Sequence, residues 1–169
     1  MSISAEDEGQ KARQVGLTYL SGRARTVREV RDKLQGKEFA AGVIDQAIED
    51  LKRLALLDDR EFARRWIESR IAGQRAAGAR KFTQDLRRKG IAAELIAEVL
   101  EEFAEELESE SAAVKLLSRQ QWRYRELDEH KAKRRMLGLL ARRGYDHELA
   151  FKAVEQAWEE IQRNDLEGD

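Results

Sequence analysis

Residues 86–100 read Leu86-Arg87-Arg88-Lys89-Gly90-Ile91-Ala92-Ala93-Glu94-Leu95-Ile96-Ala97-Glu98-Val99-Leu100. Their apolar side chains recur at spacings of three and four, which is typical of one face of an α-helix. The same pattern of apolar positions occurs 52 residues earlier, in residues 34–48, and 54 residues later, in residues 140–154. A period of about 50 residues accommodates three helices and their turns. The pattern therefore predicts three tandem copies of one helical unit.

The residues around these copies carry helix boundary signals. Thr26-Val27-Arg28-Glu29 forms a capping box at the start of a helix. Asp58 or Asp59 caps the next predicted helix start, and Asp128 and Asp146 cap two later ones. Gly90 and Gly144 mark the turn before the third helix in copies two and three, where copy one has Glu38. Single helices are expected over about 79–89 and 92–108.

No segment shows sustained strand alternation, so we predict an all-α protein. The three tandem three-helix repeats are expected to form an elongated, curved array, whose hand the sequence does not predict. The expected parts are a flexible acidic N-terminal tail (1–9), repeat 1 (10–57), repeat 2 (58–108), repeat 3 (109–163) and a C-terminal tail (164–169).

Composition excludes several classes of protein. The chain has 169 residues, with no cysteine and no proline. Without cysteine there is no disulfide framework, thiolate metal site or cysteine nucleophile. The acidic N-terminus is not a signal peptide, and no apolar run is long enough to span a bilayer. We therefore expect a soluble cytoplasmic protein with no membrane contact.

The formal net charge of −1 hides a strong segregation of charge along the chain. Residues 60–90 and 113–144 each carry ten basic and three acidic side chains, whereas residues 91–112 carry eight glutamates and no base. Residues 11–35 form a further basic block with seven basic and two acidic side chains. Because the charges are segregated, the near-zero total does not argue against a polyanionic partner.

The sequence offers no convincing catalytic or metal site. His130 and His147 are the only histidines, and both fit exposed surface positions near helix starts. The glutamates of residues 101–110 fit the solvated face of an amphipathic helix better than a metal site. No phosphate-binding glycine loop and no nucleophile with a neighbouring base is present. We therefore predict no enzyme activity, no cofactor and no small-molecule substrate.

The basic blocks are the candidate binding residues. The candidates for filament or DNA contact are Arg60, Arg64, Arg65, Arg70, Arg75, Arg80, Lys81, Arg87, Arg88, Lys89, Arg123, Arg125, Lys131, Lys133, Arg134, Arg135, Arg142 and Arg143. Trp122 and Tyr124 alternate with arginines and could stack on unpaired bases. The competing interpretation places Tyr124 in the core and Trp122 over a turn. For the basic residues, the alternative is neutralisation by the acidic helices of the same or the next repeat.

Residues 56–70, and residues 78–91 after them, resemble the signature of the RecX family of recombinase regulators. Family members share a Leu-(Asp)-Asp-x-x-Phe-Ala start, which corresponds here to Leu57-Asp58-Asp59-Arg60-Glu61-Phe62-Ala63. They also share a glycine-rich turn and a Leu-x-x-Lys-Gly-Ile helix end, here Leu86-Arg87-Arg88-Lys89-Gly90-Ile91. The resemblance is weaker over 15–54 and 112–158. Two departures are Gly78-Ala79 for the frequent Gly-Pro, and Phe82 for the frequent Ile.

The resemblance implies tandem three-helix repeats that bind the RecA–single-stranded DNA filament along its groove. It further implies inhibition of the ATPase, strand-exchange and coprotease activities of RecA, with no catalytic residues. Residues of about 59–89 are expected to supply the main contact and residues 119–143 the second. An alternative is a helical-repeat protein that binds single-stranded DNA directly, with recombinase contact secondary. A third hypothesis is a helical adaptor for another protein.

Overall fold

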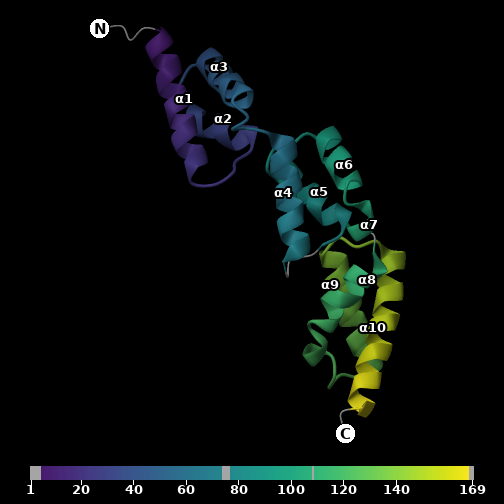
Figure 1. The fold of residues 1–169 in the computed structure, drawn as a ribbon. Coiled ribbons are helices and arrows are strands. Elements are labelled where there is room, and N and C mark those ends of the chain that lie inside the picture. Colours follow the sequence, from purple (N-terminus) through teal and green to yellow (C-terminus); the bar gives the residue numbers. More distant parts are fainter. Residues whose placement is uncertain (1–4, 74–76, 108, 168–169) are drawn as a thin grey trace. The chain divides into compact units, whose positions relative to one another are not determined.

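The computed structural model describes residues 5–73, 77–107 and 109–167 (Figure 1). Within these ranges the chain is helical, and no strand is found, so the all-α prediction is confirmed. The helices are α1 Ala5–Ser21, α2 Val27–Gln35, α3 Ala41–Arg53, α4 Asp59–Ala72, α5 Ala79–Arg88, α6 Ala93–Glu101, α7 Ala104–Leu107, α8 Glu110–Ser118, the short 3-10 helix η1 Gln121–Arg123, α9 Glu129–Arg142 and α10 His147–Glu167.

The repeated apolar positions are core positions in every copy. Leu34, Leu86 and Leu140 end the second helix of their repeats, and each is completely buried. Val43, Leu95 and Leu149 share another repeat position, and all three are half-buried. The repeated positions therefore face the core in all three copies, with Phe39 and Leu100 less deeply buried than their equivalents.

The helices group into two compact units. Unit 1 consists of Met1–Trp66 and Asp85–Val99, and unit 2 consists of Ile67–Gln84 and Leu100–Asp169. The middle repeat, α4 to α6, contributes residues to both units. In unit 1, α1 packs against α3 and α2 around a core that includes Val30, Leu34 and Ile48.

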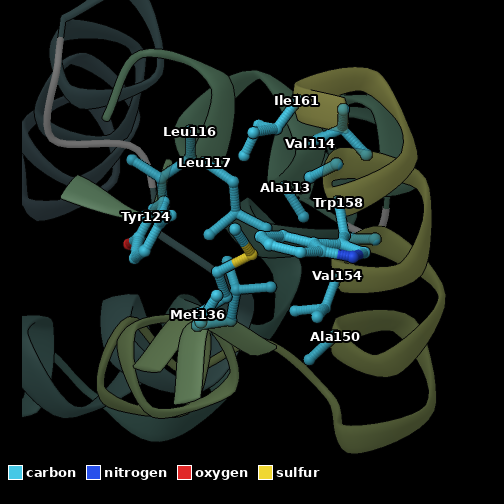
Figure 2. Packing of buried hydrophobic residues seen from close by; sticks show 14 of the residues in the cluster. Ala113, Val114, Leu116, Leu117, Tyr124, Met136, Ala150, Val154, Trp158 and Ile161 are labelled. Atoms are coloured by element: carbon cyan, nitrogen blue, oxygen red, sulfur yellow. The ribbon is translucent and has the colours of Figure 1, made fainter. Parts of the chain in front are cut away.

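In unit 2, α10 packs against α8 and α9. Figure 2 shows the core between them, with the Trp158 ring at its centre and the Met136 sulfur beside it. Tyr124 closes one side of this core next to Leu116 and Leu117. Burying large apolar side chains is the main stabilising contribution in such a bundle, at about 1.5–3 kcal/mol for each fully buried Leu, Met or Phe.

Within unit 1, the start of α2 is fixed by residues that follow it by 30 to 60 positions. The buried Thr26 hydroxyl accepts from the Glu29 N–H at 3.2 Å and donates to the Lys89 carbonyl at 2.8 Å. The Val27 N–H donates to Asp59 Oδ1 at 2.8 Å. Asp58, by contrast, accepts from two amides at the start of α4. The two aspartates thus have separate roles: Asp58 caps α4, and Asp59 holds the start of α2.

The turn before the third helix has the same backbone conformation in all three repeats. Gly90 and Gly144 have φ of +83° and +79°, and Glu38 has φ of +62° at the corresponding position. Only glycine adopts this left-handed region without strain. In unit 2 the Gly78 N–H donates to the Arg143 carbonyl at 2.9 Å, which repeats the Thr26–Lys89 contact of unit 1. Both contacts join the start of one repeat's second helix to the turn of the following repeat.

Some helix boundaries differ from those expected. The single helix predicted over 92–108 was wrong: α6 ends at Glu101, and α7 begins at Ala104. Glutamates spaced four apart, such as Glu98 and Glu102, repel one another and weaken a continuous helix here. Within the expected tails, α1 begins at Ala5 and α10 continues to Glu167.

Candidate functional site

Several candidate basic residues lie against carboxylates. Within unit 1, Arg60 pairs with Glu98 at 2.7 Å and Lys89 with Glu29 at 3.5 Å. Two further pairs of unit 1 lie within one helix, Arg65 with Glu61 and Arg88 with Asp85. In unit 2, Lys133 lies between Glu129 at 2.7 Å and Glu155 at 2.5 Å. For these residues the neutralisation interpretation has structural support.

The contacts of Lys133 also shift its own pKa and that of Glu129. Hydrogen bonds to Glu129 and Glu155 raise the pKa of Lys133, and the bond from Lys133 lowers the pKa of Glu129. Each charge is therefore stabilised by its neighbours and is less available to an outside partner.

Other candidates are placed differently. Arg64, Arg70, Lys81, Arg125 and Arg143 also interact within the chain. Arg75 lies outside the described residues. Candidates with no ion pair to any residue that the structure describes are Arg80, Arg87, Arg123, Lys131, Arg134, Arg135 and Arg142. Four of these seven lie on α9, which therefore carries more unneutralised candidates than any other described helix.

Part of this charge gathers at one cavity of unit 2, which we call the arginine pocket. It has a volume of about 560 Å³ and is lined by Arg123, Tyr124, Arg134, Arg135, Gly138, Leu139 and Arg142. Arg135, Gly138 and Arg142 follow one another at spacings of three and four, so they share one face of α9. A side chain at Gly138 would start 3.2 Å from Arg142 Nη1, so glycine leaves the room in which that guanidinium packs.

The geometry suits an anion. Guanidinium groups donate in a planar fork that matches the oxygens of a phosphate or carboxylate. Arg123 is oriented by its Nη1, which donates to Gln120 Oε1 at 2.9 Å. Burial raises the pKa of Tyr124, while the charges of Arg123, Arg142 and Arg135 lower it. Burial outweighs these charges, so the pKa of Tyr124 is raised overall and the phenol stays neutral beside three guanidinium groups.

The two aromatic candidates separate clearly. Tyr124 is only 3% exposed, so its ring cannot receive a base, and the stacking role considered for it is not supported. Trp122 is 73% exposed, and the Arg123 guanidinium lies 5.8 Å from the centroid of its ring. The exposed aromatic ring is therefore that of Trp122, the residue directly before Arg123 of the arginine pocket.

Among the described residues, no group of three or more His, Asp or Glu side chains is arranged to hold a metal ion. His130 and His147 are exposed, as expected. No helix in the described part of the chain is long and apolar enough to cross a membrane.

The four arginines of the pocket were all predicted as candidate binding residues, but Gly138 and Leu139 were not. The signal was available in the spacing of Arg134, Arg135, Gly138 and Arg142, which places one small residue among long basic ones on a single helix face.

Comparison with known proteins gives a consistent result over most of the chain. Three family models match, described as the first, second and third three-helix domains of RecX, at residues 12–51, 58–100 and 108–154. The chain is 35% identical to "Regulatory protein RecX" of Streptomyces lividans over 154 residues, covering 91% of this chain and 81% of that protein. The protein of the same name from Streptomyces coelicolor is 34% identical over the same coverage.

A solved structure shows the same fold. The crystal structure of RecX from Lactobacillus salivarius superposes with a TM-score of 0.80 at 22% identity, covering 90% of this chain and 97% of that one.

Proposed function

The chain belongs to the RecX family of regulatory proteins, and from this premise we propose that it binds the groove of the RecA–single-stranded DNA filament and inhibits RecA. The activities inhibited are ATP hydrolysis, strand exchange and coprotease activity. The match of all three RecX domains in tandem carries this proposal. The protein acts by binding and not by catalysis.

The charge distribution supports a filament as partner. A nucleoprotein filament presents anionic DNA and protein surfaces of both signs. The chain carries unneutralised cations on α9, and it has glutamates on α6 and α7. Three repeats can contact successive protomers, so several weak contacts act together and raise the overall affinity. Charges of both signs also disfavour incorrect registers along the filament.

The test is co-sedimentation with RecA filaments assembled on single-stranded DNA. The variant Arg134→Glu/Arg135→Glu removes two cations that have no ion pair within the described residues, so it changes binding without breaking an internal contact. We expect the wild type to sediment with filaments and the double variant to bind at least ~10-fold more weakly, since charge reversal replaces attraction with repulsion. Reversing Arg87, Arg88 and Lys89 is a poorer test, because Lys89 pairs with Glu29. Failure of the wild type to sediment with filaments contradicts the proposal.

A second function, direct binding of single-stranded DNA, is favoured by the arginine pocket. A phosphate fits the guanidinium groups, and an unpaired base fits the exposed ring of Trp122. The two features are adjacent in sequence, and Arg123 belongs to both.

Arg135→Glu and Lys131→Glu provide a matched pair for this function. Both residues lie on α9 and are exposed, but only Arg135 lines the pocket. In fluorescence anisotropy with a labelled thymidine oligonucleotide, Arg135→Glu should weaken binding more than Lys131→Glu. Equal losses indicate a diffuse electrostatic attraction, and absence of binding at low salt rules out direct DNA binding.

A further inference from the structure

Residues of the first basic block, together with the turn that follows α2, line a groove in unit 1 to which the function proposed above assigns no role. The groove has a volume of about 650 Å³ and lies between α1, α2 and the turn that follows α2. Its lining residues are Lys11, Gln14, Val15, Thr18, Tyr19, Lys33, Lys37 and Phe39. The floor is formed by Val15, Tyr19 and Phe39, which are only half-buried against the core.

The charge at this groove is of one sign. Three exposed lysines, Lys11, Lys33 and Lys37, stand at it, and no carboxylate is among the lining residues. None of the three forms an ion pair with a residue that the structure describes. Other cations of the same block are neutralised, for example Arg31 by Asp45 at 2.6 Å. The groove thus gathers three lysines whose charge no described carboxylate neutralises.

Two cations lie against the ring of Tyr19 at this groove. The Arg25 guanidinium lies 4.1 Å from the centroid of this ring, and Lys33 Nζ lies 5.5 Å from it. The Nε atom of Arg25 is buried without a hydrogen-bond partner in the described part of the chain. Two cations share one aromatic ring, an arrangement that an incoming carboxylate would stabilise.

We propose that this groove binds an acidic peptide segment of a partner protein that carries one large apolar side chain. The apolar side chain enters between Val15, Tyr19 and Phe39, and flanking carboxylates pair with Lys11, Lys33 and Lys37. Apolar burial supplies affinity, while the lysines select acidic flanks. A nucleic acid fits less well, because the cations at Tyr19 compete for the ring face that a base would need.

The test uses the full chain and a fluorescein-labelled peptide, Asp-Glu-Asp-Phe-Asp-Glu-Asp, followed by anisotropy. The same peptide with Ser in place of Phe measures the contribution of the apolar side chain. We expect the Phe peptide to bind about tenfold more tightly than the Ser peptide, because part of a phenyl ring becomes buried.

The variant Lys11→Glu/Lys37→Glu should weaken binding of the Phe peptide by at least ~10-fold, because two attractive contacts become repulsive. Arg13→Glu is the matched control: Arg13 is exposed on α1 but does not line the groove. It should change the affinity by less than ~2-fold, which is the size expected of a remote, screened charge. Both variants change only exposed side chains, and circular dichroism verifies that they remain helical.

Four results overturn the proposal: no binding of the Phe peptide, equal binding of the Ser peptide, equal losses in the two variants, or displacement of the peptide by a thymidine oligonucleotide whose own binding requires Lys11 and Lys37. Sedimentation of the protein alone tests a second copy as occupant. A dimer that Lys11→Glu/Lys37→Glu dissociates also contradicts the proposal. None of these measurements includes RecA, so the outcome is independent of the function proposed above.

Discussion

A left-handed turn recurs in each repeat, and substitutions at two equivalent positions of it should change the free energy of unfolding in opposite directions. Gly144→Ala should lower it, and Glu38→Gly should raise it slightly. Gly144→Ala places a Cβ 2.5 Å from the backbone N of Lys81 and 2.8 Å from its Cβ. These atoms cannot move without shifting α5. The left-handed backbone costs a non-glycine residue about 1–2 kcal/mol, and overpacking of this kind costs about 1–3 kcal/mol. We therefore expect Gly144→Ala to lower the free energy of unfolding of unit 2 by about 3 kcal/mol.

Glu38→Gly is the matched substitution in repeat 1. Glu38 already has φ of +62°, so glycine removes the backbone strain of about 1–2 kcal/mol. The greater freedom of glycine in the unfolded chain offsets about 0.4–1 kcal/mol of this gain. The net expectation is a small stabilisation, on the order of 0.5 kcal/mol.

Urea unfolding followed by tryptophan fluorescence and circular dichroism measures both effects. Trp158 is buried in the same core cluster as Tyr145, the residue after Gly144, and reports on unit 2. A loss below about 1 kcal/mol for Gly144→Ala would refute the reasoning, because the backbone term alone reaches that size. A destabilisation by Glu38→Gly as large as that by Gly144→Ala would refute the equivalence of the two turns.

Three further substitutions test individual contacts. Thr26→Val removes the cap of α2 and the hydroxyl donor to the Lys89 carbonyl, which should cost about 2–3 kcal/mol in urea unfolding, whereas Thr26→Ser should restore nearly all of it. Burial raises the pKa of Asp59 in the folded state above its value in the unfolded chain. The folded state therefore favours the neutral carboxyl, and the stability that Asp59 contributes is present below its unfolded pKa and is lost as pH rises through its folded pKa. Asp59→Asn should therefore be at least as stable as the wild type at pH 7, and its advantage should shrink as pH falls towards 4; a variant that is less stable at pH 7 contradicts this. Trp122→Ala should weaken binding of single-stranded DNA by about 1–3 kcal/mol in anisotropy titrations and leave thermal stability unchanged, because the ring is 73% exposed; unchanged DNA affinity excludes a stacking role.

The repeat was predictable because its signal is the burial of apolar residues, which the sequence carries directly. Leu34, Leu86 and Leu140 were aligned by spacing alone, and all three are completely buried. The departure at Glu38 was also visible, but its left-handed backbone was not, since glutamate gives no sign that it adopts this conformation.

Other features depend on contacts between distant residues. The sequence left open which of Asp58 and Asp59 caps α4, because the two aspartates are adjacent at the start of the helix. The structure distinguishes them because the Val27 N–H donates to Asp59 Oδ1, which leaves Asp58 to cap α4. The break between α6 and α7 was missed because apolar spacing continued through it while the repulsion among glutamates was not weighed.

The candidate site was predicted only as a collection of charges. Spacing could not show that Lys89 pairs with Glu29 or Lys133 with Glu155, because these partners are far away in the sequence, although Glu129 lies only four residues before Lys133. For the Trp122–Tyr124 pair, the interpretation that places Tyr124 in the core is confirmed, since Tyr124 is 3% exposed and Trp122 is 73% exposed. The arginine pocket emerges only when η1 and α9 are placed together.

The most direct test of regulation is ATP hydrolysis by RecA assembled on single-stranded DNA, measured while this protein is titrated from substoichiometric amounts upward. A regulator that binds along the filament through several repeats should reduce the hydrolysis rate well before it equals RecA in concentration. A dependence on Arg134 and Arg135 would connect that inhibition to the arginine pocket. A hydrolysis rate that stays unchanged over the whole concentration range, with no protein bound to the filament, would contradict the proposed function.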